Sequence, residues 1–419
     1  MSNKRKLIFT LMAVTGLLVV MTVTALASSL SPIEELGKAI FFDENLSINQ
    51  NQSCASCHDP AWGWTGPDSL INASGSVYEG SILGRFGDRK PPSAAYATFS
   101  PIFYQDKKGL FVGGNFWDGR ATGEVLGNPA ADQALGPFLN PKEQALPDSA
   151  CVVYRVCQAS YLVSFEDVWG AGTCAIAWPA DIEAACATEG ATVALSEDDR
   201  AKSDEAYGNI GLAVAAFEDS YEVNAFTSKF DYIFLGGTKL TKQEQRGYAL
   251  FQGKGKCKLC HPGGKDELFT DFTFDNLGIP QNPDNPAGVA PDFVDPGLGG
   301  FLMNTGYDED VYLAEWGKHK VPTLRNVDLR PSEDSVKAYG HNGYFKTLEG
   351  IVHFYNTRDV LDTCPGLYTE AEALAANCWP APEVAENVNK DELGDLGLTP
   401  AEEAAIVAFL KTLSDGYMP

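Results

Sequence analysis

Two Cys-x-x-Cys-His strings are the residues of this sequence whose types and spacing point most directly to chemistry. They consist of Cys54, Cys57 and His58, and of Cys257, Cys260 and His261. In such a string the two thiols add to the vinyl groups of a porphyrin, and the adjacent histidine binds the iron. Two strings in one chain disfavour a zinc site or a disulfide. The sequence therefore predicts two covalently bound c-type haems, with His58 and His261 as proximal iron ligands.

The first haem lacks an evident second axial ligand. An iron that only carries electrons is usually six-coordinate, whereas an iron that reacts with a small molecule needs an open position. No histidine lies between the two strings, and the only methionines after residue 28 are Met303 and Met418. The sequence therefore predicts an open, five-coordinate iron above His58, unless the second half of the chain supplies a ligand.

The segments that precede the two strings resemble each other and predict helices. One runs from Ser31 to Phe41 and the other from Thr241 to Phe251, and both place a glutamate three residues after the opening Ser or Thr, as in a capping box. A further helix, expected after Thr399, would bring an apolar face onto the second haem. Its apolar positions are Ile406, Leu410 and Leu413. The fold class expected is mainly α, with two tandem cytochrome c-like domains, long loops and few strands.

The repeat sets the expected domain limits. Residues 28–235 would form the N-terminal cytochrome c-like domain with the open haem, and residues 236–419 the C-terminal domain with the electron-transfer haem. Stretches rich in Gly, Pro, Ser or Asp over 59–130 and 274–300 predict loops, and 198–229 has a helical pattern.

The N-terminus has the features of an export signal. Lys4, Arg5 and Lys6 precede an apolar run that ends in a small-x-small cleavage pattern at residues 25–27. We predict a cleavable signal peptide over 1–27 and a periplasmic location. An uncleaved anchor is the alternative, because the run is nearly long enough to span a bilayer.

The chain is strongly acidic, with 56 acidic and 31 basic residues and a formal net charge of −25. This charge disfavours a nucleic acid as partner. It would attract basic partners over long range, although solubility alone is an equally good explanation.

Six cysteines remain outside the haem strings. They are Cys151, Cys157, Cys174, Cys186, Cys364 and Cys378. An even number in an exported chain predicts three disulfides, for which fifteen pairings are possible. Proximity in the sequence favours pairing Cys364 with Cys378, Cys174 with Cys186, and Cys151 with Cys157.

Three further segments, at 116–121, 321–327 and 340–343, resemble signature segments of the bacterial dihaem cytochrome c peroxidase / MauG family. The resemblance covers nearly the whole mature chain and keeps the order of the motifs. It implies an active first haem, a second haem that transfers electrons, hydrogen peroxide as substrate, and a small cytochrome or copper protein as electron donor. It also leaves a homodimer as an open alternative.

The resemblance assigns roles to three residues of the first half. Trp117 falls where the family has a tryptophan between the haems that can relay an electron hole. Gln133 and Glu143 match the distal Gln and Glu above the open haem. Peroxide must lose a proton from its inner oxygen and gain one on its outer oxygen before the O–O bond breaks, and a partly buried carboxylate can do both.

The second haem needs a ligand opposite His261. The pattern over residues 347–355 predicts a helix. Its apolar face carries Leu348, Ile351, Val352 and Tyr355. The family has methionine at the last position in the peroxidases and an iron-ligating tyrosine in MauG, so the resemblance implies Tyr355 as the ligand. A core tyrosine with Met303 on the iron is the alternative. His341 matches a family histidine between the haems.

A calcium ion between the haems is also implied by the resemblance, but the chain departs from the pattern there. Tyr96 stands where the family has an asparagine ligand. An insertion changes 329–337, where backbone carbonyl ligands are expected. Calcium prefers six to eight oxygen ligands, so the sequence leaves the ion open.

Three functions are compatible with these residues. The first is reduction of hydrogen peroxide at the first haem with electrons delivered through the second. The second is a MauG-like oxidase, which uses a high-valent dihaem state to oxidise Trp or Tyr of a partner protein; Tyr355 favours it. The third is a non-catalytic dihaem electron carrier. The pair Gln133 and Glu143 argues against the third, because a carrier has no use for a distal acid.

Overall fold

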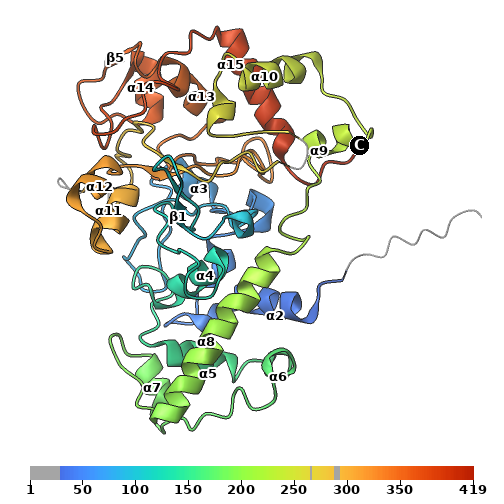
Figure 1. Ribbon diagram of the computed structural model, residues 1–419, viewed down its shortest axis with the longest axis vertical. Helices are drawn as coiled ribbons and strands as arrows, with labels where there is room; N and C mark the ends of the chain where they lie inside the picture. The colour runs from blue at the N-terminus through green and yellow to red at the C-terminus, as the bar shows by residue number, and fades with distance from the viewer. Residues whose placement is uncertain (1–28, 265–266, 287–292) are drawn as a thin grey trace, which may run out of the picture. The chain divides into compact units, whose positions relative to one another are not determined.

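Helices make up most of the regular structure in a computed structural model, which describes residues 29–264, 267–286 and 293–419 (Figure 1). The predicted signal peptide over 1–27 lies outside these residues. The α-helices are α2 (Pro32–Phe41), α3 (Ser69–Ala73), α4 (Pro129–Leu139), α5 (Ser149–Val156), α6 (Leu162–Trp169), α7 (Ile182–Cys186), α8 (Glu197–Glu218), α9 (Lys229–Phe234), α10 (Lys242–Gln252), α11 (Gly297–Asn304), α12 (Glu309–Ala314), α13 (Leu348–Thr357), α14 (Glu370–Ala376) and α15 (Pro400–Leu410). None of the helices within the described part of the chain is long and apolar enough to cross a membrane.

The strands are short and form three two-stranded ladders. They are β1 (Tyr104–Gln105) antiparallel to β2 (Phe111–Val112), β3 (Phe274–Asp275) antiparallel to β4 (His319–Lys320), and β5 (Asp362–Thr363) parallel to β6 (Cys378–Trp379). In the second ladder Phe274 pairs with Lys320 and Asp275 with His319. The expectation of a mainly helical protein with few strands is confirmed. Residues Pro32–Pro419 form one compact unit, and the domain limit at 235/236 stays a prediction.

The predicted helices before the two haem strings are present as α2 and α10. In α10, Thr241 and Glu244 form the reciprocal capping box that the sequence predicts, and Thr399 and Glu402 do the same for α15. The helix predicted over 198–229 is wrong at its C-terminal end. It is α8, which ends at Glu218, because a turn follows and Ser228 caps a new helix, α9.

Each half of the chain contains one close crossing of two helices. Helix α2 packs on α8, and α10 packs on α15 (Figure 1). A Cβ atom added to Gly37 would lie 1.8 Å from the carbonyl oxygen of Ala213, and one added to Gly247 would lie 1.8 Å from that of Ala405. Only glycine permits these approaches. The two crossings are built alike, which agrees with the sequence repeat.

Each crossing also closes a trio of aromatic rings. The first trio consists of Phe41, Trp64 and Phe217, and the second of Phe251, Phe269 and Phe409. Ring centroids within a trio are 5.2–6.2 Å apart, mostly edge to face, which is the favoured arrangement of packed aromatics. All six rings are buried.

The disulfides correct two of the three predicted pairings. Cys364–Cys378 is confirmed, whereas the others are Cys151–Cys186 and Cys157–Cys174. Helix α5 explains the error. It carries Cys151 and ends against Cys157, and six residues of helix separate two Cα atoms by about 9 Å, which is too far for a disulfide.

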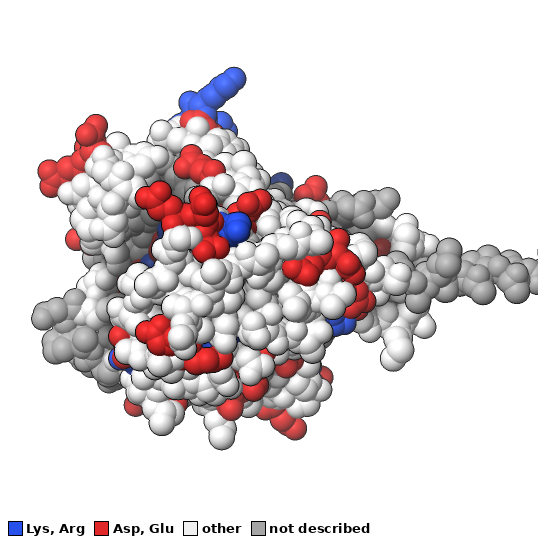
Figure 2. All heavy atoms as spheres, turned by 90° about the horizontal axis from the view of Figure 1, so that it is seen from below, with Lys and Arg blue, Asp and Glu red and all other residues white. Residues whose placement is uncertain are grey.

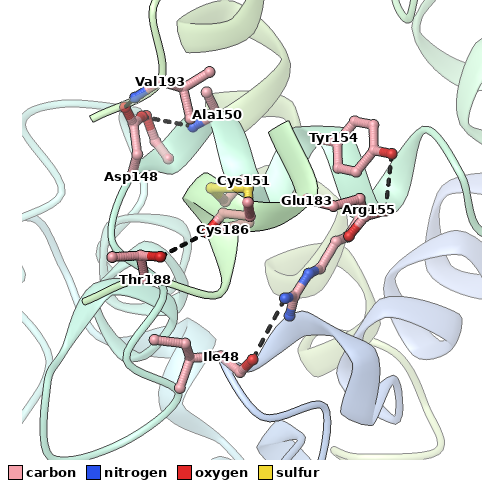
Figure 3. The surroundings of a disulfide bond; sticks show 12 residues. Ile48, Asp148, Ala150, Cys151, Tyr154, Arg155, Glu183, Cys186, Thr188 and Val193 are labelled. Carbon is pink, nitrogen blue, oxygen red and sulfur yellow. Dashed lines mark hydrogen bonds between the residues drawn. A yellow bond between two sulfur atoms is a disulfide. The ribbon is translucent and has the colours of Figure 1, made fainter. Parts of the chain in front are cut away.

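The disulfide between Cys151 and Cys186 joins α5 to α7 (Figure 3). Beside it, Arg155 reaches from α5 to the loop that follows α2. Its guanidinium donates to the carbonyl oxygen of Asn45 at 2.7 Å and also to that of Ser47. The cross-linked segment is thereby anchored to the region that leads into the first haem string.

Candidate functional site

The two haem strings each open onto a large cavity. The first cavity, about 1110 Å³, is lined by Cys54, Cys57 and His58. The second, about 1370 Å³, is lined by Cys257, Cys260 and His261. Two thiols and one imidazole that line the same cavity fit a covalently attached haem.

The two histidines are oriented in the same way. His58 Nδ1 lies 3.1 Å from the carbonyl oxygen of Trp64, and His261 Nδ1 lies 2.7 Å from that of Phe269. A ring that donates from Nδ1 keeps the lone pair of Nε2 for a metal. Burial lowers the pKa of His58 to about 4 and also lowers that of His261, so both rings are neutral. Neutral imidazole is the form that binds iron.

The four cysteines of the strings are free thiols in this structure. Burial raises the pKa of Cys57 to about 12 and raises the pKa of Cys54 and Cys260 as well. Buried neutral thiols are poor ligands for a bare metal ion, which needs thiolates. They suit thioether bonds to a porphyrin.

The predicted distal pair of the first haem lines the first cavity. Gln133 lies on α4, which Asn128 caps, and Glu143 follows in the next turn. The side chain of Asn140 donates to Glu143 Oε1 at 2.6 Å. Burial raises the pKa of Glu143, while Arg120 and Asn140 oppose the shift. The cavity thus holds an oriented carboxyl whose proton affinity is increased.

The first cavity contains no second iron donor of the usual kind. Among the described residues that line it, His58 is the only histidine, and there is no methionine. Both remaining methionines lie on the surface, with Met303 43% and Met418 89% exposed. The first cavity is therefore lined by one histidine, that of the haem string, and by the polar side chains of Gln133 and Glu143.

One residue of the first cavity was not anticipated from the sequence. Glu218, the last residue of α8, is 4% exposed and lines the cavity. Burial raises its pKa to about 8. An acid at the end of a long helix gives no sequence signal of this kind, because such positions are usually solvated.

Tyr355 lines the second cavity together with Leu348, Ile351 and Val352, the apolar face that the sequence predicts for α13. Burial raises the pKa of Tyr355, with the nearby Cys260 and Cys257 adding to the shift. Neither Met303, the alternative ligand, nor His353, the histidine of the same helix, lines this cavity. Met303 is exposed on α11, and His353 Nδ1 lies 3.0 Å from Glu403.

A common wall separates the two cavities. Trp117 and residues 320–323 line both of them. Trp117 is 9% exposed, and its indole N–H donates to the carbonyl oxygen of Lys90 at 2.8 Å. The backbone N–H of Lys320 donates to the carbonyl of Trp117, also at 2.8 Å. The indole is thus fixed between the two sites.

A stacked histidine pair borders the second cavity. The rings of His319 and His341 lie 3.6 Å apart at an angle of 10°. His319 faces Asp295 at 3.2 Å, and His341 faces Glu383 at 3.1 Å. The sequence indicated His341 through a family motif, whereas His319, in a short strand, gave no signal.

Three comparisons identify the class of protein that this arrangement defines. A family model described as di-haem cytochrome c peroxidase matches residues 31–239. The methylamine utilization protein MauG of Paracoccus denitrificans (strain Pd 1222) is 35% identical over 389 residues, which cover 91% of this chain and 88% of that protein. The cytochrome-c peroxidase IdrP2 of Denitromonas iodatirespirans is 27% identical over 392 residues, covering 91% of this chain and 81% of that protein.

The fold agrees with this placement. The crystal structure of the diheme peroxidase BthA from Burkholderia thailandensis E264 superposes with a TM-score of 0.70 at 27% identity, and covers 93% of this chain and 87% of that chain. The chain belongs to the di-haem cytochrome c peroxidase family that includes MauG, as the resemblance implied. Two haem cofactors follow from that membership.

Proposed function

We propose that this protein is a periplasmic dihaem c-type cytochrome that reduces hydrogen peroxide at its first haem, with electrons delivered through the second. The observation that carries the proposal is the first cavity. It combines a proximal histidine, a buried carboxyl with a raised pKa and no second histidine or methionine among its described lining residues. These features support an enzyme over an electron carrier.

The haem bound by Cys54, Cys57 and His58 would supply an iron that exchanges electrons with peroxide. The protein's part is proton transfer. Glu143 accepts the proton of the inner peroxide oxygen and returns it to the outer oxygen, which leaves as water. Gln133 orients the peroxide through its amide. Two electrons and two further protons complete the reduction to a second water.

Trp117 is proposed to connect the two sites. It lies in the wall that both cavities share, and its indole is held by one hydrogen bond to a backbone carbonyl. Tyr355 lines the same cavity as His261 and would, with it, hold the iron of the second haem. A phenolate favours the ferric state more than a thioether does, so the second haem would have a low reduction potential.

Low-temperature electron paramagnetic resonance of the resting ferric holoprotein tests the open first site. We expect one high-spin signal from the haem at His58 and one low-spin signal from the haem at His261. Two low-spin signals, with no peroxide consumption in the presence of a reduced small cytochrome, would show that the protein is a carrier.

A second candidate function is oxidation of Trp or Tyr side chains in a partner protein. Tyr355 at the second cavity and the 35% identity to MauG favour it. The two functions differ in the source of electrons. Rapid peroxide consumption driven by a reduced cytochrome or copper protein supports the peroxidase. Slow turnover with such donors, together with peroxide-dependent oxidation of a co-purifying protein detected by mass spectrometry, supports the oxidase.

Export, haem attachment and assembly belong to the same proposal. The intact mass of the purified protein should equal the chain from residue 28 plus two haems, with the haems retained after acid extraction. A mass that includes residues 1–27 would indicate an anchor. Light scattering would distinguish a monomer from the homodimer that the resemblance leaves open.

A further inference from the structure

The chain holds a buried ammonium group where two distant segments meet. Lys337 is 4% exposed. Its Nζ donates to the carbonyl oxygens of Trp62 at 2.8 Å, Asn326 at 2.7 Å and Leu329 at 3.0 Å. Trp62 belongs to the first half of the chain and the other two to the second. One side chain therefore ties the halves together through backbone oxygens only.

The three acceptors indicate that this group is charged. A neutral amine has two N–H donors, whereas an ammonium has three, and three carbonyl oxygens lie within 3.0 Å. Burial lowers the pKa of Lys337 and the nearby Lys90 and Arg330 lower it further, while Asp328 opposes the shift. The carbonyl oxygens of Trp62, Asn326 and Leu329, here called the carbonyl cage, stabilise a positive charge at this buried position.

The residues expected to bind calcium do not fit that ion here. Tyr96, at the position of the family's asparagine ligand, donates its hydroxyl to Asp415 at 2.7 Å and accepts from the N–H of Phe226 at 3.0 Å. Arg325 places its guanidinium 5.2 Å from the Tyr96 ring. In the 329–337 segment, the carbonyl of Leu329 already faces Lys337. Calcium needs six to eight oxygens. Here the Tyr96 hydroxyl has protein partners, and the Lys337 ammonium meets the carbonyl oxygens of Trp62, Asn326 and Leu329.

We propose that the Lys337 ammonium takes the place of the calcium ion between the halves of this chain. A fixed cation then organises the carbonyls that a bound divalent ion would otherwise organise. The dihaem unit is therefore independent of calcium.

The position of the cage gives it a role at the first haem. Trp62 lies in the loop that follows His58, and two residues later Trp64 accepts the hydrogen bond from His58 Nδ1. Ser93 holds the opposite side of this loop by donating to the carbonyl of Gly63 at 2.7 Å. Lys337 thus positions the loop that orients the proximal histidine.

The first test uses the wild-type holoprotein. Elemental analysis after gel filtration should find no stoichiometric calcium. The melting temperature should be unchanged by EGTA and by millimolar calcium chloride. One tightly bound calcium ion per chain, or a melting temperature that falls with EGTA, would overturn the proposal. Neither readout depends on enzymatic activity.

The second test replaces the ammonium. Lys337→Met leaves the buried carbonyls of Trp62 and Leu329 without a donor and removes one of the two donors of the Asn326 carbonyl, and we expect the melting temperature to fall by about 5 °C. The resonance signal of the first haem should broaden or shift, while that of the second is retained.

Lys346→Met is the matched control. That lysine also donates to backbone carbonyls from both halves, at Ser74 and Gly343, but away from the loop after His58. It should leave the first-haem signal unchanged. Equal spectra for the two variants, or an unchanged melting temperature in Lys337→Met, would contradict the proposal; if that variant does not fold, the wild-type calcium measurements decide it.

Discussion

The two halves of this protein share the same helix crossing and aromatic packing, but they differ in the side chains that line their cavities. In each half a glycine lets two helices cross closely, three aromatic rings pack against one another at the crossing, and the haem-string histidine donates to the backbone carbonyl of one of those aromatics. The cavities differ on their remaining walls. The first has Glu143 and Gln133, and the second has Tyr355.

The difference between the two cavities is clearest at the C-terminal ends of α8 and α15. Phe217 and Phe409 occupy matching places in the two crossings, and the residue after each lines its cavity. That residue is Glu218 in the first half and Leu410 in the second. The shared packing therefore positions each haem string, whereas the two cavities differ in a few side chains from α4, α8 and α13 and in Glu143, which follows α4.

Removal of the distal acid should have the largest effect. Glu143→Gln keeps the shape of the side chain but not its proton transfer, so the rate of reaction with peroxide should fall about 10²–10⁴-fold. Stopped-flow spectroscopy of the resting protein measures this rate. Glu124→Gln, an exposed residue outside the cavity, is the control and should react like wild type. An unchanged rate in Glu143→Gln would remove Glu143 as the acid–base group.

The equivalence of the two helix crossings can be tested by adding one methyl group to the glycine of each crossing. Gly37→Ala and Gly247→Ala each force a Cβ onto a backbone carbonyl, and each should destabilise the fold by about 3 kcal/mol. Thermal unfolding compares the two variants. Gly366→Ala, where the new methyl meets no atom within 4 Å, should be neutral. A large loss in one crossing and none in the other would show that the halves are not packed alike.

Tyr355→Met should make the second site resemble that of the peroxidases. A thioether ligand raises the reduction potential of a haem relative to a phenolate, here by on the order of 100 mV. Spectroelectrochemical titration measures the potentials of both haems. Tyr339→Phe alters another tyrosine of the same cavity and should shift the potential little. If both variants keep the wild-type potential and spectrum, Tyr355 does not bind the iron.

The last comparison concerns the pH dependence of stability that Glu218 contributes. Its folded pKa of about 8 exceeds the ordinary 4.5 of an unfolded glutamate. The unfolded chain therefore releases this proton first, and stability falls as pH rises from about 4.5 to about 8, by at most ~1.4 kcal/mol per pH unit. Glu218→Leu should remove that slope, and Leu410→Glu should introduce one in the second half. Melting temperatures measured between pH 5 and 8 give the comparison, and parallel profiles for wild type and Glu218→Leu would disprove the assignment.

The sequence predicted the parts of the molecule that depend on local signals. A capping box located α10, a proline at the first helical position located α15, and the haem strings located both cavities. The apolar period of α13 placed Tyr355 on an inward face. These features depend on residues only a few positions apart, so periodicity and spacing are sufficient to find them.

Features that depend on distant contacts were missed. The pairings of Cys151 and Cys157 depend on how α7 and the turn at Cys174 fold back against α5. Lys337 lies in an insertion and finds its partners 275, 11 and 8 residues away. Glu218 is buried at the end of α8, which packs on α2, α4 and α5. The acidic surface was foreseen from composition, and on the face in Figure 2 red acidic side chains predominate over blue basic ones.

The cysteines impose an order on maturation. Six of them form three cross-links, and the four cysteines of the haem strings form none. An oxidant strong enough to make the cross-links would also join Cys54 to Cys57 or Cys257 to Cys260, and a thiol already oxidised cannot add to a porphyrin. A cell that makes this protein must therefore keep four sulfurs reduced while it oxidises six. Production in a host without a reducing pathway dedicated to those four should yield an oxidised chain without haem.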